Sequence, residues 1–326
     1  MPAGRSECSR RGFGEETGPM PLETLDRVYP NIVPENNLRL PDAITIIHGP
    51  RRLLARFILA GDRAARQMGL HLRVRHDFDA LLWLNRREAA RGNWYPLIDM
   101  MNPERVSLTP ENAFWVSGEN EDGEIVVTWG ARIFDWRGTS LAEQVCAMFY
   151  GEDRGQPCIV TAEAAARITG IAVCGVASWV RPDYRRQHLS RLIPRIGKAY
   201  ACARWPIDWS FCYVTRKHVE QGLAASYGQR NVGYSISYPG TPWLDIALAY
   251  STAAEVYDDM ACFLAADLSA ASSFQEAAGD DASPPRRFEH IVTNTSSTAS
   301  SMAAGAFDSG SGARVCRLRP GTGSRS

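Results

Sequence analysis

Residues 179–190 read Trp-Val-Arg-Pro-Asp-Tyr-Arg-Arg-Gln-His-Leu-Ser and join a predicted strand to a predicted helix. The apolar run 171–180 is rich in strand-forming residues, and the pattern after position 189 repeats at helical spacing. The first backbone N–H groups of a helix have no partner within it, and the helix dipole favours an anion at that end. A strand that enters a helix through a basic loop therefore predicts a phosphate-binding site.

The segment resembles motif A of the GNAT acyltransferases, in which a Gln/Arg-x-x-Gly-x-Gly/Ala loop holds the pyrophosphate of acyl-CoA. Arg185 fills the first position of that loop, His188 stands where glycine is usual, and Ser190 stands where glycine or alanine is usual. A Cβ atom at position 188 restricts the approach of the backbone to phosphate and disfavours positive φ. With a negative φ, His188 would still donate its N–H to phosphate, whereas a ring that pointed inward would occlude the site. Pro194 is a second departure, because it removes a hydrogen bond from the predicted helix.

The resemblance implies that acetyl-CoA or another acyl-CoA binds as co-substrate and that its acyl group passes to an amine. Main-chain groups of Trp179 and Val180 would pair with the pantetheine arm. The amides of 186–190 would surround the pyrophosphate, and arginine side chains, which match phosphate oxygens, would add positive charge. The implied cofactor-binding residues are Trp179, Val180, Arg185, Arg186, Gln187, His188, Leu189 and Ser190. The alternative is a strand, turn and helix that bind no ligand.

The resemblance also implies a general acid at Tyr227, whose hydroxyl would protonate the departing CoA thiolate. Tyr227 precedes Gly233-Tyr234, which is similar to a Tyr…Gly-Phe ending in the family, although the gap of six positions is longer than usual. A tyrosine of the core is the alternative interpretation. The general base is not assigned, and the candidates, each of which also fits an ordinary surface residue, are Asp208, Glu163 and His218.

The 8 cysteines show neither a C-x-x-C motif nor zinc-ligand spacing, which predicts no metal site. A catalytic thiol would need a histidine partner, such as His188 or His218 beside Cys174 or Cys212. Both cysteines have apolar neighbours in the sequence, which fits buried structural thiols better. The N-terminus lacks an apolar signal region, and no apolar run approaches the length of a membrane span. We expect a cytoplasmic protein that does not span a membrane.

Acidic and basic residues balance at 36 each, so the whole chain favours neither nucleic acid nor membrane as a partner. Region 181–230 differs, with ten Lys/Arg against three Asp/Glu. This excess suits an anionic ligand such as a nucleotide cofactor, and an ordinary solvated face is the alternative. A further alternative is an RNA-associated protein that stacks bases on Tyr184 and Trp205, although the sequence carries no RNA-recognition motif.

Both ends of the chain are too polar to pack into a core. We expect a disordered or extended segment at 1–41, a GNAT-like domain at 42–268 with an N-terminal helix and an insertion at about 137–167, and a disordered tail at 269–326. Periodicity predicts helices at 51–68, 78–90, 95–101, 140–150, 189–203, 217–227 and 252–268. It predicts strands at 71–75, 112–118, 124–136, 158–161, 168–180, 207–214, 233–238 and 243–250.

Two local signals support this division: Asp77 as an N-cap and Asp122-Gly123 as a hairpin turn. The element order matches the GNAT topology, an α/β fold with a mixed, mostly antiparallel central sheet flanked by helices. We therefore interpret the chain as a GNAT-like N-acyltransferase that acts on an unidentified amine. The alternatives are a catalytically inactive GNAT-fold binding protein and the RNA-associated protein that uses 181–230. The sequence specifies neither the acyl chain nor the oligomeric state.

Overall fold

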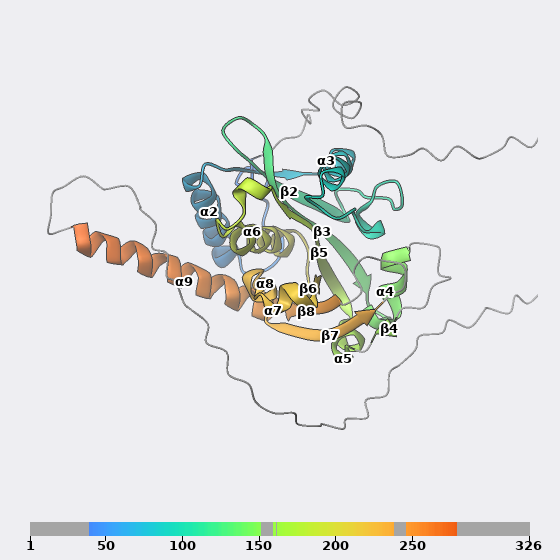
Figure 1. Ribbon diagram of the computed structural model, residues 1–326. Coiled ribbons are helices and arrows are strands. Elements are labelled where there is room, and N and C mark those ends of the chain that lie inside the picture. The colour runs from blue at the N-terminus through green and yellow to red at the C-terminus, as the bar shows by residue number, and fades with distance from the viewer. Residues whose placement is uncertain (1–38, 151–158, 161, 238–245, 279–326) are drawn as a thin grey trace, which may run out of the picture.

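A computed structural model describes residues 39–150, 159–160, 162–237 and 246–278, and it shows a central sheet with helices on both faces (Figure 1). The strands are β1 His71–Arg75, β2 Ala113–Glu119, β3 Ile125–Trp136, β4 Ile159–Val160, β5 Gly170–Val180, β6 Trp209–Thr215, β7 Asn231–Ser237 and β8 Ile246–Thr252. The helices are α2 Arg51–Gln67, α3 Phe78–Ala90, α4 Leu141–Tyr150, α5 Glu163–Arg167, α6 Leu189–Arg204, α7 Arg216–Glu220, α8 Leu223–Ser226 and α9 Ala253–Ala278. Two 3-10 turns, η1 Asp99–Met101 and η2 Pro182–Tyr184, complete the described elements.

The sheet has eight strands in the order β1-β2-β3-β5-β6-β8-β7-β4. Neighbouring strands run antiparallel, except that β5 and β6 run parallel because α6 connects them as a crossover. The predicted fold class, a mixed and mostly antiparallel sheet flanked by helices, is confirmed. The parallel pair lies in the middle of the sheet.

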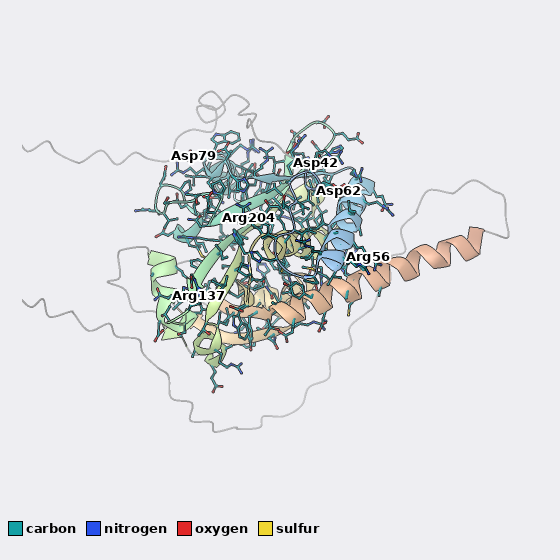
Figure 2. The ribbon with its side chains drawn as sticks, turned by 180° about the vertical axis from the view of Figure 1, so that it is seen from behind. Asp42, Arg56, Asp62, Asp79, Arg137 and Arg204 are labelled. Atoms are coloured by element: carbon teal, nitrogen blue, oxygen red, sulfur yellow. The ribbon has the colours of Figure 1, made fainter. Side chains whose placement is uncertain are left out.

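Alternate residues of β2 face two separate cores. Phe114 and Val116 pack with α2, α6 and α9 on one face, whereas Ala113 and Trp115 pack with α3, α4 and α5 on the other. Figure 2 shows the molecule from behind, with Asp62 on α2 and Arg204 at the end of α6. One face of α2 is buried in the core, and its arginines lie mostly on the opposite face in solvent. The α2 helix is therefore a packed surface helix.

Several local predictions match the structure. The Asp77 side chain accepts a hydrogen bond from the Ala80 N–H at 3.0 Å and so caps α3. The turn between β2 and β3 contains Gly123 with φ +79°, as the hairpin signal requires. The short strand predicted at 158–161 is β4, which pairs with β7.

Other predictions are corrected. The helix predicted at 217–227 is two short helices, because Gly222 adopts φ 80° and interrupts it. The helix predicted at 95–101 is reduced to the turn η1, and α5 lies inside the insertion predicted at about 137–167. Part of the strand predicted at 243–250 lies outside the described residues.

The domain limits also differ from those predicted. Leu40 is fully buried in the core and Arg39 forms a β-bridge with Arg73, so the packed part includes residues placed in the N-terminal segment. At the other end, α9 continues past residue 268 to Ala278. The remainder of the predicted terminal segments lies outside the described residues.

Candidate functional site

Strands β5 and β6 diverge near the middle of the sheet. They pair only over Ala172–Gly175 and Trp209–Cys212. Beyond that point β5 continues to Val180 along β3, and β6 continues to Thr215 along β8. The two strands therefore enclose a wedge, which contains a cavity of about 660 Å³.

A β-bulge shapes the β5 side of this wedge. Thr128 pairs with Trp179 but Gly130 pairs with Val176, so β5 carries an extra residue opposite Trp129. Ala177 in the bulge has φ 49°, and its carbonyl accepts a hydrogen bond from Thr128 Oγ1 at 2.8 Å. Bulges redirect side chains next to active sites, and this one turns Ser178 toward Tyr227.

The loop before α6 presents a row of backbone donors. Within the described part of the chain, the N–H groups of residues 186–190 donate to no protein acceptor. Arg186 and His188 both have positive φ, at 67° and 59°, and alternation of this kind makes successive N–H groups converge. The loop thus has the features of an anion-binding concavity at the N-terminus of a 16-residue helix.

His188 takes the left-handed conformation that favours glycine. Of the two cases considered from the sequence, the condition of a negative φ does not apply: φ is positive, as a glycine would allow, and the imidazole is exposed. A non-glycine residue in this region costs on the order of 1 kcal/mol. Histidine at this position is therefore compatible with the left-handed bend of the loop. Pro194 lies within α6, which continues through it to Arg204.

The Arg185 guanidinium lies across the wide end of the wedge. Its Nε donates to the Val180 carbonyl at 3.2 Å and its Nη2 donates to the Asn93 carbonyl at 3.0 Å. Next to this bridge, the rings of Trp94 and Trp179 stack with centroids 5.3 Å apart and planes 17° apart. Loop 92–98 is thereby held over the end of β5, a contribution that no periodic pattern in the sequence indicates.

Tyr227 reaches the wedge from the C-terminal end of α8. Its hydroxyl is 3.0 Å from Ser178 Oγ, and both residues line the cavity. Burial raises the pKa of Tyr227 to about 12, so the phenol keeps its proton at neutral pH. The predicted general acid is thus protonated and next to the bulge of β5.

Side chains from α6 hold the backbone around Tyr227. Arg195 donates to the carbonyls of Ser226 and Ala225 and pairs with Asp259 at 2.7 Å, and Lys198 Nζ donates to the Gly228 carbonyl at 2.9 Å. Ser190 Oγ lies 3.0 Å from Ser226 Oγ. We call the set Arg195, Lys198 and Asp259 the α6 clamp.

The three candidates for a general base lie in different places. Asp208 Oδ2 accepts the Ile171 N–H at 2.8 Å, at the opposite end of β5 from the bulge. Glu163 is exposed at the start of α5 and does not line the cavity. His218 does line it, and its Nδ1 is 2.9 Å from Thr215 Oγ1.

The cysteines considered as nucleophiles have the wrong ionisation for that role. Burial raises the pKa of Cys212 to about 11 and raises the pKa of Cys174 well above its ordinary value. A thiol in this state is not a thiolate at neutral pH. These positions fit structural cysteines, as their apolar neighbours indicate.

Part of the basic excess in 181–230 has a structural role. Arg195 and Lys198 are buried in the α6 clamp, and Arg181 pairs with Glu124 at 2.7 Å. Arg204 donates to the Pro110 carbonyl at 2.7 Å. The two buried cations are not accessible to a nucleic acid, so the predicted RNA surface is smaller than the residue count suggests.

Within the described residues, no group of three His, Cys, Asp or Glu side chains is arranged to hold a metal ion. None of the helices in the described ranges combines the length and apolar character needed to cross a bilayer.

No protein-family model matches the chain, and no curated protein matches its sequence. Similar solved structures include an acetyltransferase of the GNAT family from Streptococcus pneumoniae, with 12% identity and a TM-score of 0.33 over 56% of this chain and 99% of that chain. A GNAT-superfamily phosphinothricin acetyltransferase from Sinorhizobium meliloti, in complex with AcCoA, has 14% identity and a TM-score of 0.32 over 57% of this chain and 89% of that chain. RimJ from Mycobacterium smegmatis, in complex with CoA-disulfide, has 10% identity and a TM-score of 0.35 over 59% of this chain and 88% of that chain.

The identities and TM-scores of these structures are low, so nothing about the activity of this chain follows from them.

Proposed function

We propose that the chain is an N-acyltransferase that binds acyl-CoA in the wedge between β5 and β6 and transfers the acyl group to an amine. The observation that carries this proposal is the divergence of the parallel pair after Gly175 and Cys212, together with the cavity it encloses. A linear pantetheine arm can pair with the free side of β5 where β6 has separated from it. Tyr227 and the basic loop 185–190 would then both contact the same acyl-CoA molecule.

The residues present fit such a ligand. The unpaired N–H groups of 186–190 would hold the pyrophosphate. Val180, whose carbonyl faces Arg185 and not β3, would offer main-chain groups to the pantetheine arm, whereas Trp179, whose main chain pairs with Thr128, would line the arm with its side chain. Arg185 would exchange its contact with the Val180 carbonyl for a phosphate oxygen, because guanidinium binds phosphate more strongly than a neutral carbonyl. Gln187 and Leu189 would contribute through their backbone.

In the proposed reaction, the amine nitrogen attacks the thioester carbonyl carbon and the C–S bond breaks. The Tyr227 phenol would give its proton to the departing thiolate, a role that its raised pKa supports. Main-chain N–H groups at the β5 bulge would stabilise the negative charge on the carbonyl oxygen. Most of the acceleration would come from alignment of the two reactants in the wedge.

Thermal unfolding with CoA tests the binding site. At 100 times its dissociation constant a ligand adds about 2.7 kcal/mol, which corresponds to about 5–10 °C for a domain of this size. We expect this shift in the wild type and in Arg63→Glu, a matched charge reversal on the exposed face of α2. Arg185→Glu should abolish it. A full shift in Arg185→Glu would disprove the site, and no shift in the wild type would favour the binding-protein alternative.

Substitution of Tyr227 tests the chemistry. Tyr227→Phe should lower kcat by about 100-fold, a usual effect of losing a general acid, while the CoA-induced shift persists. An unchanged kcat would support the interpretation of Tyr227 as a core residue.

A further inference from the structure

One wall of the wedge is apolar and aromatic. It belongs to the face covered by α3, and loop 92–98 contributes to it together with β6 and β8. The side chains that form it are Trp94, Tyr95, Leu97, Ile98, Tyr213 and Ile246. A wall of this kind fits the hydrocarbon or ring of a small molecule.

The described lining of the cavity has no negative charge. Among the described residues that line it, none is Asp or Glu, and the guanidinium of Arg185 is held by two main-chain carbonyls. Removing a cation from water is costly unless an opposite charge or hydrogen-bond acceptors offset the loss of hydration, and the described lining offers no carboxylate for this. The cleft therefore disfavours acceptors that keep positive charges when bound, such as polyamines.

Among the described residues that line the cavity, His218 is the one with an imidazole ring. Thr215 caps α7 and its Oγ1 lies 2.9 Å from His218 Nδ1. When Nδ1–H donates to this oxygen, Nε2 carries the free lone pair. The ring is thereby oriented as a base from a short helix next to α8, which carries Tyr227.

We infer, on the basis of the proposed acyl transfer, that the acceptor is an amine on an apolar or aromatic body and that His218 takes its ammonium proton. One proton passes from the ammonium to His218 Nε2 and then to solvent. The neutral nitrogen attacks the thioester carbon. As the amide forms, the nitrogen loses a second proton. This proton returns to the Tyr227 phenolate, which has given its own proton to the thiolate.

A pair of acceptors tests the substrate class. With acetyl-CoA as donor, release of the CoA thiol is measured with 2-phenylethylamine and with spermidine. We expect kcat/KM to favour 2-phenylethylamine by about 100-fold, because spermidine would bring uncompensated charges into the cleft. A preference for spermidine would overturn the substrate class while leaving acyl transfer intact.

A substitution at position 218 tests the base. The side chain of Asn in His218→Asn can still contact Thr215 but cannot take the proton. With 2-phenylethylamine, an ammonium at neutral pH, kcat should fall by about 100-fold. With aniline, which is already neutral, it should stay within about twofold. His71→Asn, an exposed histidine on β1, is the matched control.

Failures of the two proposals are distinguishable. Absence of a CoA-induced thermal shift in the wild type would remove the proposed function itself. A normal shift with equal slowing of both amines in His218→Asn would assign His218 a structural role and overturn the inference. A normal shift without turnover of either amine would overturn it as well.

Discussion

Removal of Arg195 should destabilise the protein strongly, because the α6 clamp is buried. The side chains of Arg195 and Asp259 are only 8% and 14% exposed. Removal of one partner of a buried pair costs about 3–5 kcal/mol, and the partial exposure of Asp259 favours the lower end. At about 2–4 °C per kcal/mol, Arg195→Met should lower Tm by about 6–12 °C.

The assay is thermal unfolding at pH 7, with kcat measured well below Tm. Arg137→Met is the matched control, because it removes an exposed arginine that pairs with Asp135, and we expect its Tm to equal that of the wild type. A Tm for Arg195→Met within about 2 °C of the wild type would refute the buried-pair reasoning. An unchanged kcat with a lowered Tm would separate the clamp's stabilising role from any positioning of Tyr227.

Two further predictions concern packing and pH. An added Cβ in Gly197→Ala would overlap the Trp129 ring, so stability should fall by about 1–3 kcal/mol in chemical denaturation, whereas Gly138→Ala, which meets no atom within 4 Å, should show no such loss. Burial raises the pKa of Cys202 to about 12, so the folded state keeps a proton that the unfolded state loses above its ordinary value of 9.0. Stability from this thiol is fully present below pH 9.0 and is lost toward pH 12, and Cys202→Ala should flatten the alkaline decline in unfolding free energy, a result that an unchanged slope would contradict.

Local patterns in the sequence predicted much of the fold. Asp77 and Gly123 act through neighbours a few residues away, so their types alone indicate a cap and a turn. The order of strands around α6 followed from the same periodicities. What the sequence did not reveal depends on contacts between distant residues.

Arg195 and Lys198 illustrate that limit. As basic residues near a predicted phosphate loop they suggested a ligand surface, but tertiary packing places them against the carbonyls beside Tyr227. The bridge from Arg185 to Asn93 joins residues 92 positions apart. His188 is a different case, because the surrounding loop imposes on it a conformation that its residue type disfavours.

The divergence of β5 and β6 has a consequence for solubility. It creates unpaired strand edges in the interior of the sheet, at 177–180 and 213–215, whereas most sheets have such edges only at their rims. Free edges attract strands from other molecules. Here loop 92–98, fastened by Arg185 and by the stacked Trp94, covers one of them. The contacts of Arg185 and Trp94 that shape the cleft would therefore also keep strands of other molecules from pairing with the free edge of β5.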